Sequence, residues 1–154
     1  MNGLVLAPAQ RTTVARLTGT TLTGQRLDTA SWRGHVIVVN FWGSWCAPCR
    51  KEAPELARTA RATAPYGVRF LGVDIRDKLS AGRAFEARYG IPYPSLFDQP
   101  SRNALQFNGI GGRAVPFTIV LDAGGRVAAR YEGATTYGPL RETVAQVVGR
   151  AMSR

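Results

Sequence analysis

"NFWGSWCAPCRKEAPEL", residues 40–56, contains both cysteines of this 154-residue chain, Cys46 and Cys49. The stretch continues the apolar, β-branched run "HVIVVNFW" (35–42), so it predicts a buried strand that ends in a turn and a helix. Two cysteines separated by two residues can form a metal clip, a structural staple or a redox pair. These three alternatives make different demands on the rest of the chain.

Two of the alternatives find little support in the sequence. A structural zinc site takes about four ligands, and the only further candidate among Cys and His is His35, at the far end of the preceding strand. A metal would need carboxylates or a second chain, so we expect no metal site. The interpretation as a structural staple is also weak. A disulfide stabilises chiefly by closing a long loop in the unfolded chain, and the loop between Cys46 and Cys49 is very short.

The redox interpretation has a mechanism. At the first turn of a helix, unpaired backbone N–H groups and the positive end of the dipole stabilise an anion. Cys46 is predicted there, so the pKa of its thiol should fall below the free value of about 8.5. Cys49, one turn later, can attack a mixed disulfide and release the partner. Pro48 suits the helix start, and Arg50 and Lys51 add positive charge.

The composition bounds the class of protein. The net charge of +10 comes from 18 Arg and 2 Lys against 10 acidic residues. Attraction to anionic lipid or acidic partners is one interpretation, but the arginines are scattered, and a solvated surface is simpler. Because no basic stripe alternates with aromatic residues, nucleic-acid binding is not expected.

The length suits one domain, and we expect a flexible tail over residues 1–10 and a single domain over 11–154. No apolar run approaches the roughly 18 residues of a membrane span. "LVLA" at 4–7 is too short for the core of a signal peptide. Either the protein is cytoplasmic, or a leader or anchor lies outside this sequence.

The remaining pattern predicts a mixed α/β domain. We expect a small hairpin within 14–34, strands at 35–42, 68–75 and 95–98, helices at 47–64, 78–89, 101–107 and 138–152, and a second hairpin over 116–133. A strand–helix–strand unit followed by a hairpin and a helix gives an α/β sandwich around a mixed sheet.

Taken together, "VVNFWGSWCAPCRKEAPEL" resembles the thioredoxin superfamily, and more narrowly its extracytoplasmic TlpA/ResA-like reductases, over about residues 14–150. The resemblance implies a thioredoxin-like three-layer sandwich with a mixed central sheet, an N-terminal hairpin and a central insert over residues 78–110.

The resemblance also assigns residues that bind substrate. "AVPFTIVLD" (114–122) is similar to the family's cis-proline segment, which implies that Pro116 shields the sulfurs and that the Val115 backbone hydrogen-bonds a substrate peptide. A trans proline opening an edge strand is the alternative. Trp45 is implied to pack beside the cysteines and to form part of the docking surface, unless it is a simple core aromatic.

The chain departs from the pattern of cytoplasmic thioredoxins at Asn40, where those proteins carry a buried Asp. A buried acid near the resolving thiol helps it gain or lose a proton. The extracytoplasmic pattern implies an acid after the second strand, which is Asp77 here, with Asp74 as the second candidate. Alternatively, Asp77 only caps the following helix. Glu52 and Glu55 are expected on the helix surface or facing a partner.

The leading function is a thiol:disulfide reductase that works outside the cytoplasm. It would keep the haem-binding cysteines of apocytochrome c reduced, drawing electrons from a membrane thiol reductant. We expect a monomer that acts on protein thiols and disulfides with no cofactor beyond the Cys46–Cys49 disulfide.

Three other functions compete with this one. A disulfide oxidase for secreted proteins uses the same motif at a higher potential, and Ala47–Pro48 does not decide between them. A thiol peroxidase typically has Thr a few residues before its cysteine, and "GSWCAPC" lacks that pattern. A binding module with idle cysteines is disfavoured by the completeness of the motif.

Overall fold

The computed structural model of the chain describes residues 3–107 and 114–152. Its centre is a six-stranded sheet in the order β1-β8-β7-β4-β5-β6. The strands are β1 Gly3–Val5, β4 Ile37–Trp42, β5 Arg69–Ile75, β6 Ser95–Asp98, β7 Phe117–Leu121 and β8 Val127–Glu132. Strands β4, β5 and β6 run parallel, whereas β7 pairs antiparallel with β4 and β8, and β1 antiparallel with β8. The sheet is therefore mixed, as predicted.

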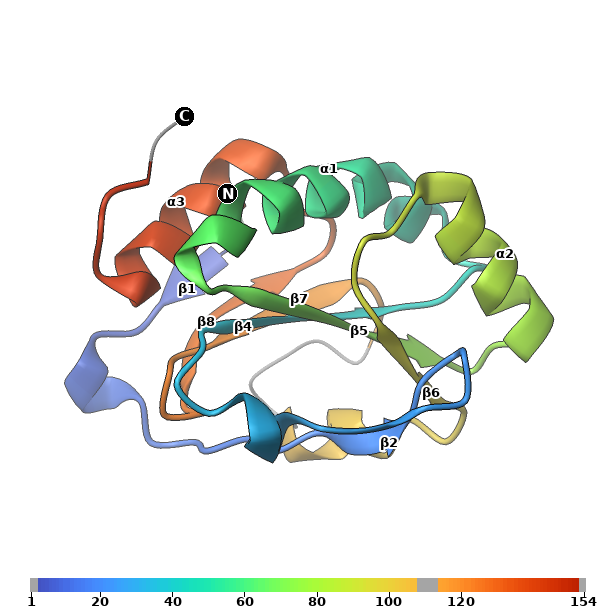
Figure 1. Cartoon of the computed structure of the whole chain (residues 1–154), viewed down its shortest axis with the longest axis horizontal. Coiled ribbons are helices and arrows are strands. Elements are labelled where there is room, and N and C mark those ends of the chain that lie inside the picture. The colour runs from blue at the N-terminus through green and yellow to red at the C-terminus, as the bar shows by residue number, and fades with distance from the viewer. Residues whose placement is uncertain (1–2, 108–113, 153–154) are drawn as a thin grey trace.

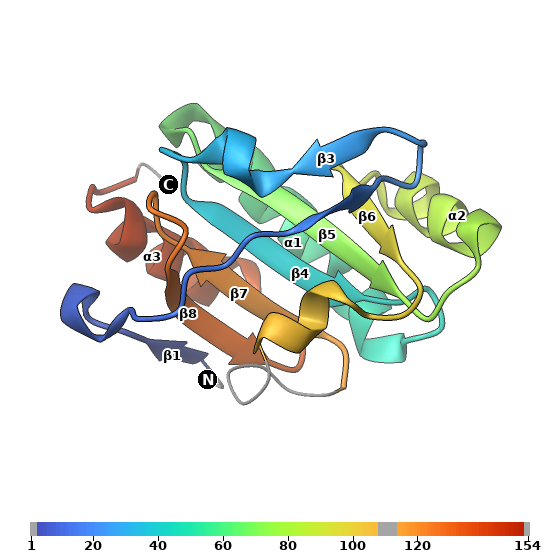
Figure 2. The ribbon, with the colours of Figure 1, turned by 90° about the horizontal axis from the view of Figure 1, so that it is seen from below.

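Helices cover one face of this sheet and the N-terminal hairpin covers the other (Figure 1). The helices are α1 Ala47–Thr63, α2 Leu79–Tyr89 and α3 Tyr137–Val148. In Figure 2, β3 (Arg26–Asp28) and the 3-10 helix Asn103–Phe107 lie over the opposite face, where β2 (Thr18–Thr20) pairs with β3. These layers confirm the predicted three-layer α/β sandwich.

Strand β4 leads the chain through the core to the cysteines. All six of its residues are buried, because both faces of the sheet are covered. Ile37 and Phe41 pack into the core on the hairpin side, while Val38 packs with residues of α1 and α3. Successive strand residues alternate between faces, so Asn40 and Trp42 face the same side as Val38, towards the cysteine helix.

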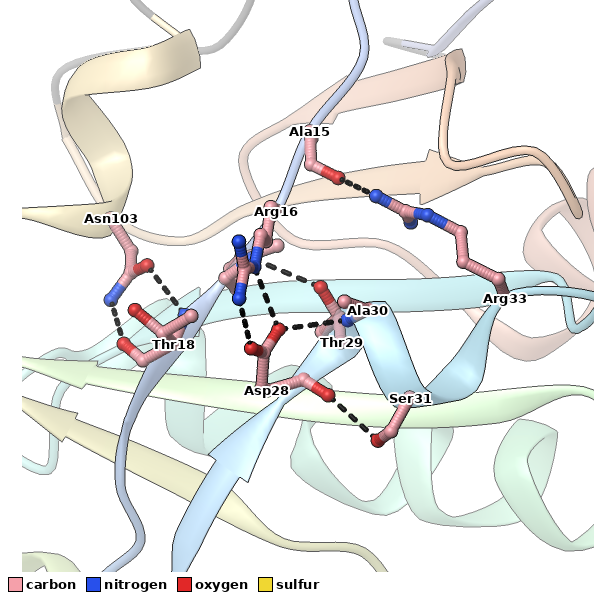
Figure 3. Close-up of polar contacts among 10 residues, drawn as sticks. Ala15, Arg16, Thr18, Asp28, Thr29, Ala30, Ser31, Arg33 and Asn103 are labelled. Carbon is pink, nitrogen blue, oxygen red and sulfur yellow. Dashed lines mark hydrogen bonds and ion pairs between the residues drawn. The ribbon is translucent and has the colours of Figure 1, made fainter.

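The N-terminal hairpin is fastened to the central insert by polar contacts (Figure 3). Asn103 pairs with the backbone of Thr18, accepting from its N–H at 3.2 Å and donating to its C=O at 3.0 Å. Arg16 forms an ion pair with Asp28. The Asp28 carboxylate also accepts the Ala30 N–H at 2.9 Å and so caps the following 3-10 helix. The predicted hairpin is thus part of the packed domain.

Residues 3–10 correct the prediction of a flexible tail over residues 1–10. Strand β1 pairs with β8, the Leu6 N–H donates to the Ala128 carbonyl at 2.8 Å, and Pro8–Gln10 form a 3-10 turn. Without β1, strand β8 would present unpaired backbone groups at the sheet edge, and β1 satisfies them. A three-residue strand has too little alternation to be visible in the sequence.

The central insert forms α2, β6 and the 3-10 helix Asn103–Phe107, and its last residues, 108–110, lie outside the described residues. Among the residues that the structure describes, no helix combines the length and the apolar character needed to cross a bilayer.

Candidate redox site

The nucleophile position is built by the start of α1. Cys46 is the N-cap residue of this helix, with extended backbone angles, and its Sγ accepts the backbone N–H of Cys49 at 3.2 Å. The two cysteines form a disulfide. An N–H donor and the positive end of the helix dipole both stabilise negative charge on sulfur. The reduced site therefore favours the thiolate at Cys46.

Both sulfurs are shielded in this disulfide form. Cys46 is 4% exposed and Cys49 is 1% exposed, and they pack with Trp42, Ala53 and Phe85. The order of exposure agrees with Cys46 as the residue that meets a partner, but the difference is small.

The cis-proline segment lies against the same sulfur. The Val115–Pro116 peptide bond is cis, as predicted. The Val115 carbonyl oxygen lies 3.7 Å from the Cys46 Sγ, and Phe117, directly after the proline, pairs with Phe41 at the end of β4. The sheet thus brings two segments that are far apart in sequence to one sulfur atom.

Trp45 lies at the surface rather than in the core. Its side chain leaves the residue 49% exposed, although the indole Nε1 donates to the Ile75 carbonyl at 3.3 Å. The alternative of a core aromatic is therefore wrong. A Cβ on Gly43 would overlap the Trp45 ring, so glycine at that position leaves room for the indole beside Cys46.

Asp77 lies between β5 and α2 and contacts the loop before Cys46. Its carboxylate accepts the Ser44 N–H at 2.8 Å, the Ser44 hydroxyl at 2.7 Å and the Lys78 N–H at 2.9 Å. Burial disfavours its charge, but interactions with the neighbouring Asp74, Ser44 and Lys78 outweigh burial, so its pKa lies below the ordinary value. Asp77 is thus an ionised group that holds the active-site loop to the start of α2.

Asp74, the second acid candidate, is fully buried on β5. Neither of its carboxyl oxygens has a hydrogen-bond partner of normal geometry, and a Cβ on Gly82 of α2 would overlap one of them. Burial, followed by the nearby negative charge of Asp77, raises the pKa of Asp74 well above its ordinary range. Asp74 is therefore protonated at neutral pH.

Glu52 overturns the expectation that it lies on the helix surface. It is 1% exposed, and its carboxyl accepts the Asn40 side-chain amide at 2.8 Å and the Thr135 N–H at 3.0 Å. Burial raises its pKa to about 7, against the lowering effect of those two hydrogen bonds. One signal was present in the sequence: Glu52 is three residues after Cys49 and four before Leu56, on one helical face.

A small cavity of about 10 Å³ lies beside the resolving cysteine. Cys49, Asn40, Trp42 and Ser95 are among the residues that line it, and this volume is close to the space of one water molecule. Since Asn40 also donates to Glu52, the cavity and the buried carboxyl share one polar side chain. Asn40, which cannot titrate, thus links Glu52 to the surroundings of Cys49.

His35 lies far from the cysteines along β4, with its Nδ1 2.6 Å from the Gly67 carbonyl oxygen. Among residues 3–107 and 114–152, no group of three or more His, Cys, Asp or Glu side chains could hold a metal ion. The site instead has the parts of a dithiol–disulfide centre.

A CxxC disulfide at a helix N-cap, set beside a cis-proline on a mixed sheet of this order, defines a thioredoxin-like redox domain. The chain belongs to the Redoxin family, whose sequence profile matches residues 7–147. This membership places it in the thioredoxin superfamily, as the motif indicated.

Individual proteins show the same relation. The chain is similar to the thiol:disulfide interchange protein HelX of Rhodobacter capsulatus, with 37% identity over 103 residues, which cover 67% of this chain and 55% of HelX. It is 28% identical to the thiol-disulfide oxidoreductase ResA of Bacillus subtilis, over 73% of this chain and 62% of ResA. The chain thus spans little more than half the length of these two relatives. The TlpA/ResA-like resemblance is confirmed.

A solved structure extends the likeness to the whole fold. The crystal structure of a secreted thiol-disulfide isomerase from Corynebacterium glutamicum superposes with a TM-score of 0.88 at 28% identity. The alignment covers 96% of this chain and 92% of that one.

Glu52 predicts a specific dependence of stability on pH. Because its pKa is about 7 in the folded protein against an ordinary 4.5, the folded state holds a proton that the unfolded chain releases. The contribution of Glu52 to the free energy of unfolding should therefore be greatest below about pH 4.5 and fall as pH rises through about 7, by about 1–3 kcal/mol. Glu52→Gln should remove this component, which urea titrations across that range would measure.

Glu55→Gln is the matched control, since Glu55 lies on the same helix and is partly exposed. Glu55→Gln should keep the fall in unfolding free energy with pH that Glu52 contributes, so its curve should run parallel to that of wild type between about pH 4.5 and 7. A Glu52→Gln protein whose stability fell with pH as steeply as wild type would show that Glu52 titrates normally.

Proposed function

We propose that this chain is a thiol:disulfide oxidoreductase that acts as a reductase of disulfides in extracytoplasmic proteins. The observation that carries the proposal is the N-cap sulfur of Cys46, which receives the Cys49 N–H at 3.2 Å. A thiolate stabilised in this way is both a competent nucleophile and a competent leaving group. Cys49 lies one turn further into the core, where only an intramolecular reaction reaches it.

The reaction proceeds in two exchanges. The Cys46 thiolate attacks one sulfur of the substrate disulfide, forms a mixed disulfide and releases the other substrate sulfur as a thiolate, which takes a proton. Cys49 then loses its proton and attacks the Cys46 sulfur, which forms the Cys46–Cys49 disulfide and releases the second substrate thiolate. Two electrons pass to the substrate, and an external dithiol returns the protein to its reduced form.

Substrate is positioned by the segments that border Cys46. The Val115 backbone, which lies beside the Cys46 sulfur, offers strand-like hydrogen bonds to an extended peptide. Pro116 shields the sulfurs from one side, and the half-exposed face of Trp45 supplies an apolar docking surface on the other.

Glu52 and Asp77 have different roles: Glu52 accepts a proton, and Asp77 positions the active-site loop. Glu52 is buried on the same helical face as Cys49, carries a pKa of about 7 and reaches the cavity beside Cys49 through Asn40. It therefore accepts the Cys49 proton at a pH where the exchange runs. Asp77, the acid expected from the sequence, acts on Cys46 through its hydrogen bonds to Ser44.

The wider setting of the reaction rests on the resemblance to TlpA/ResA-like proteins. We infer that the substrates include apocytochrome c, that a membrane thiol reductant supplies the electrons and that the protein works outside the cytoplasm as a monomer. The secreted character stated for the isomerase of Corynebacterium glutamicum supports the location.

The direction of electron flow is tested by the reduction potential of the Cys46–Cys49 pair. A reductase should have a potential near that of thioredoxin, about −270 mV, whereas the alternative of a disulfide oxidase needs a value near about −120 mV. Equilibration with glutathione redox buffers, followed by trapping of free thiols, gives this value. A potential near about −120 mV would show that the protein is a disulfide oxidase and would overturn the proposed reductase function.

The two cysteines should differ when each is removed. Cys49→Ser should accumulate a mixed disulfide with substrate, because nothing attacks the Cys46 sulfur, whereas Cys46→Ser should accumulate none. Non-reducing gel electrophoresis after incubation with a disulfide-bonded protein shows the adduct. Adduct formation through Cys49 in the Cys46→Ser protein would reverse the assignment.

The two acids should affect the thiols differently. Asp77→Asn removes a negative charge near the active-site loop, so the apparent pKa of Cys46 should fall, whereas Glu52→Gln should change the pH dependence of the resolving step at Cys49. Alkylation rates against pH report the first, and release of a trapped mixed disulfide reports the second. Curves for Asp77→Asn that superimpose on wild type would leave Asp77 with a purely structural role in the loop.

A further inference from the structure

Positively charged side chains lie on and beside the loop that leads to Cys46. Four exposed cations come from two elements, Arg50 and Lys51 at the start of α1 and Arg76 and Lys78 before α2. We call these four residues the basic collar. They are close together only in the fold, because the end of β5 lies beside the end of β4, and both strands run in the same direction.

Contacts place the collar on the active-site loop itself. The Arg50 Nη1 donates to the Ser44 carbonyl at 3.0 Å, and the Arg76 guanidinium lies 5.5 Å from the centre of the Trp45 ring. Lys78 directly follows Asp77, whose carboxylate binds Ser44. Two of the four cations, Arg50 and Arg76, therefore contact the two residues that precede the reactive sulfur.

Arg76 adopts a backbone conformation that is uncommon for its side chain. Its φ is +46°, in the left-handed region that residues other than glycine rarely occupy. Such conformations cluster where a structure holds a residue for a ligand or a partner. Here the conformation accompanies a guanidinium beside the exposed indole of Trp45.

None of the four collar residues forms an ion pair within the described part of the chain. The ion pairs found there are Arg11–Asp122 and Arg16–Asp28, and neither involves a collar residue. Two acids are adjacent in sequence to collar residues, and both are buried. Asp77 accepts backbone and hydroxyl donors, and Glu52 accepts from Asn40 and Thr135. The four exposed cations are therefore available to an anionic group that approaches the active-site loop.

We propose that the basic collar docks acidic segments of protein substrates, so that preferred substrates carry Asp or Glu within a few residues of the reacting cysteine. This inference rests on the proposed oxidoreductase function and narrows its substrate class. Complementary charge raises the rate of encounter and fixes orientation more than it raises affinity. The collar is adjacent to the sulfur, so an acidic segment held there brings its neighbouring disulfide to Cys46.

An anionic lipid surface is the competing occupant for such cations. The geometry favours a peptide, because two collar residues contact the loop that leads to Cys46, and a membrane bound there would cover the Cys46–Cys49 disulfide. The apolar indole of Trp45 and the Val115 backbone on the far side of the sulfur also suit an extended chain.

The test uses two synthetic peptides, each with one internal disulfide, that differ only in two residues beside one cysteine, Glu in one and Lys in the other. Reduced wild-type protein should reduce the Glu peptide about tenfold faster than the Lys peptide near 10 mM salt, and the ratio should approach one near 1 M salt, since the Debye length falls from about 30 Å to about 3 Å. The readout is the second-order rate constant from acid-quenched thiol trapping.

Variants locate the effect. Arg76→Gln combined with Lys78→Gln should bring the ratio of the two rates close to one. Arg69→Gln combined with Arg126→Gln is the matched control: it removes the same charge at two exposed positions at the opposite edge of the sheet, beside the start of β4, and should retain most of the ratio. Because each ratio is measured within one variant, a general loss of activity cancels.

Each other outcome overturns the inference. A wild-type ratio of one at low salt, or equal loss of the ratio in both double variants, would exclude docking by the collar. Collar-dependent co-sedimentation with vesicles of phosphatidylglycerol and phosphatidylcholine, with a peptide ratio of one, would assign the collar to a membrane surface. Failure to reduce even hydroxyethyl disulfide, a small neutral substrate, would instead reject the proposed function.

Discussion

The site depends on one hydrogen bond, from the backbone N–H of Cys49 to the sulfur of Cys46. It makes the nucleophile the cap of its own helix, so the first turn of α1 and the reactive sulfur are a single local structure. Helices leave their first N–H groups unpaired, and here the sulfur fills the role usually taken by a Ser or Asp oxygen. The strand, the cis-proline segment and the acids are arranged around this pair.

Much of this arrangement could be predicted from the sequence, because the signals are local. The run 35–42 and the CxxC motif predict a strand that leads into a helix, and "AVPF" predicts the proline segment from its resemblance. Glu52 was missed because charge suggested a surface position, and its burial depends on Asn40 and on the Thr135 N–H, two partners distant in sequence. Strand β1 was missed because three residues carry no detectable period and its pairing partner is more than a hundred residues away.

The acids of the site show how position in the fold, rather than residue type, sets protonation. Asp77 accepts three hydrogen bonds and is ionised, whereas Asp74, three residues earlier, has none of normal geometry and is protonated. Glu52 is as buried as Asp74 but has two donors, which leaves its pKa near neutrality. A group whose pKa lies near neutrality is suited to exchange a proton with a thiol at physiological pH.

The hydrogen bond between Glu52 and the Thr135 amide has a consequence for how the interior can be observed. Thr135 lies just before α3, far along the chain from the cysteines, yet its N–H ends on the carboxyl that lies beside Cys49 on α1. The electronic environment of that amide, and so its NMR chemical shift, changes when the carboxyl loses its proton. The amide resonance of Thr135, just before the C-terminal helix, therefore reports whether the buried carboxyl of Glu52 is protonated.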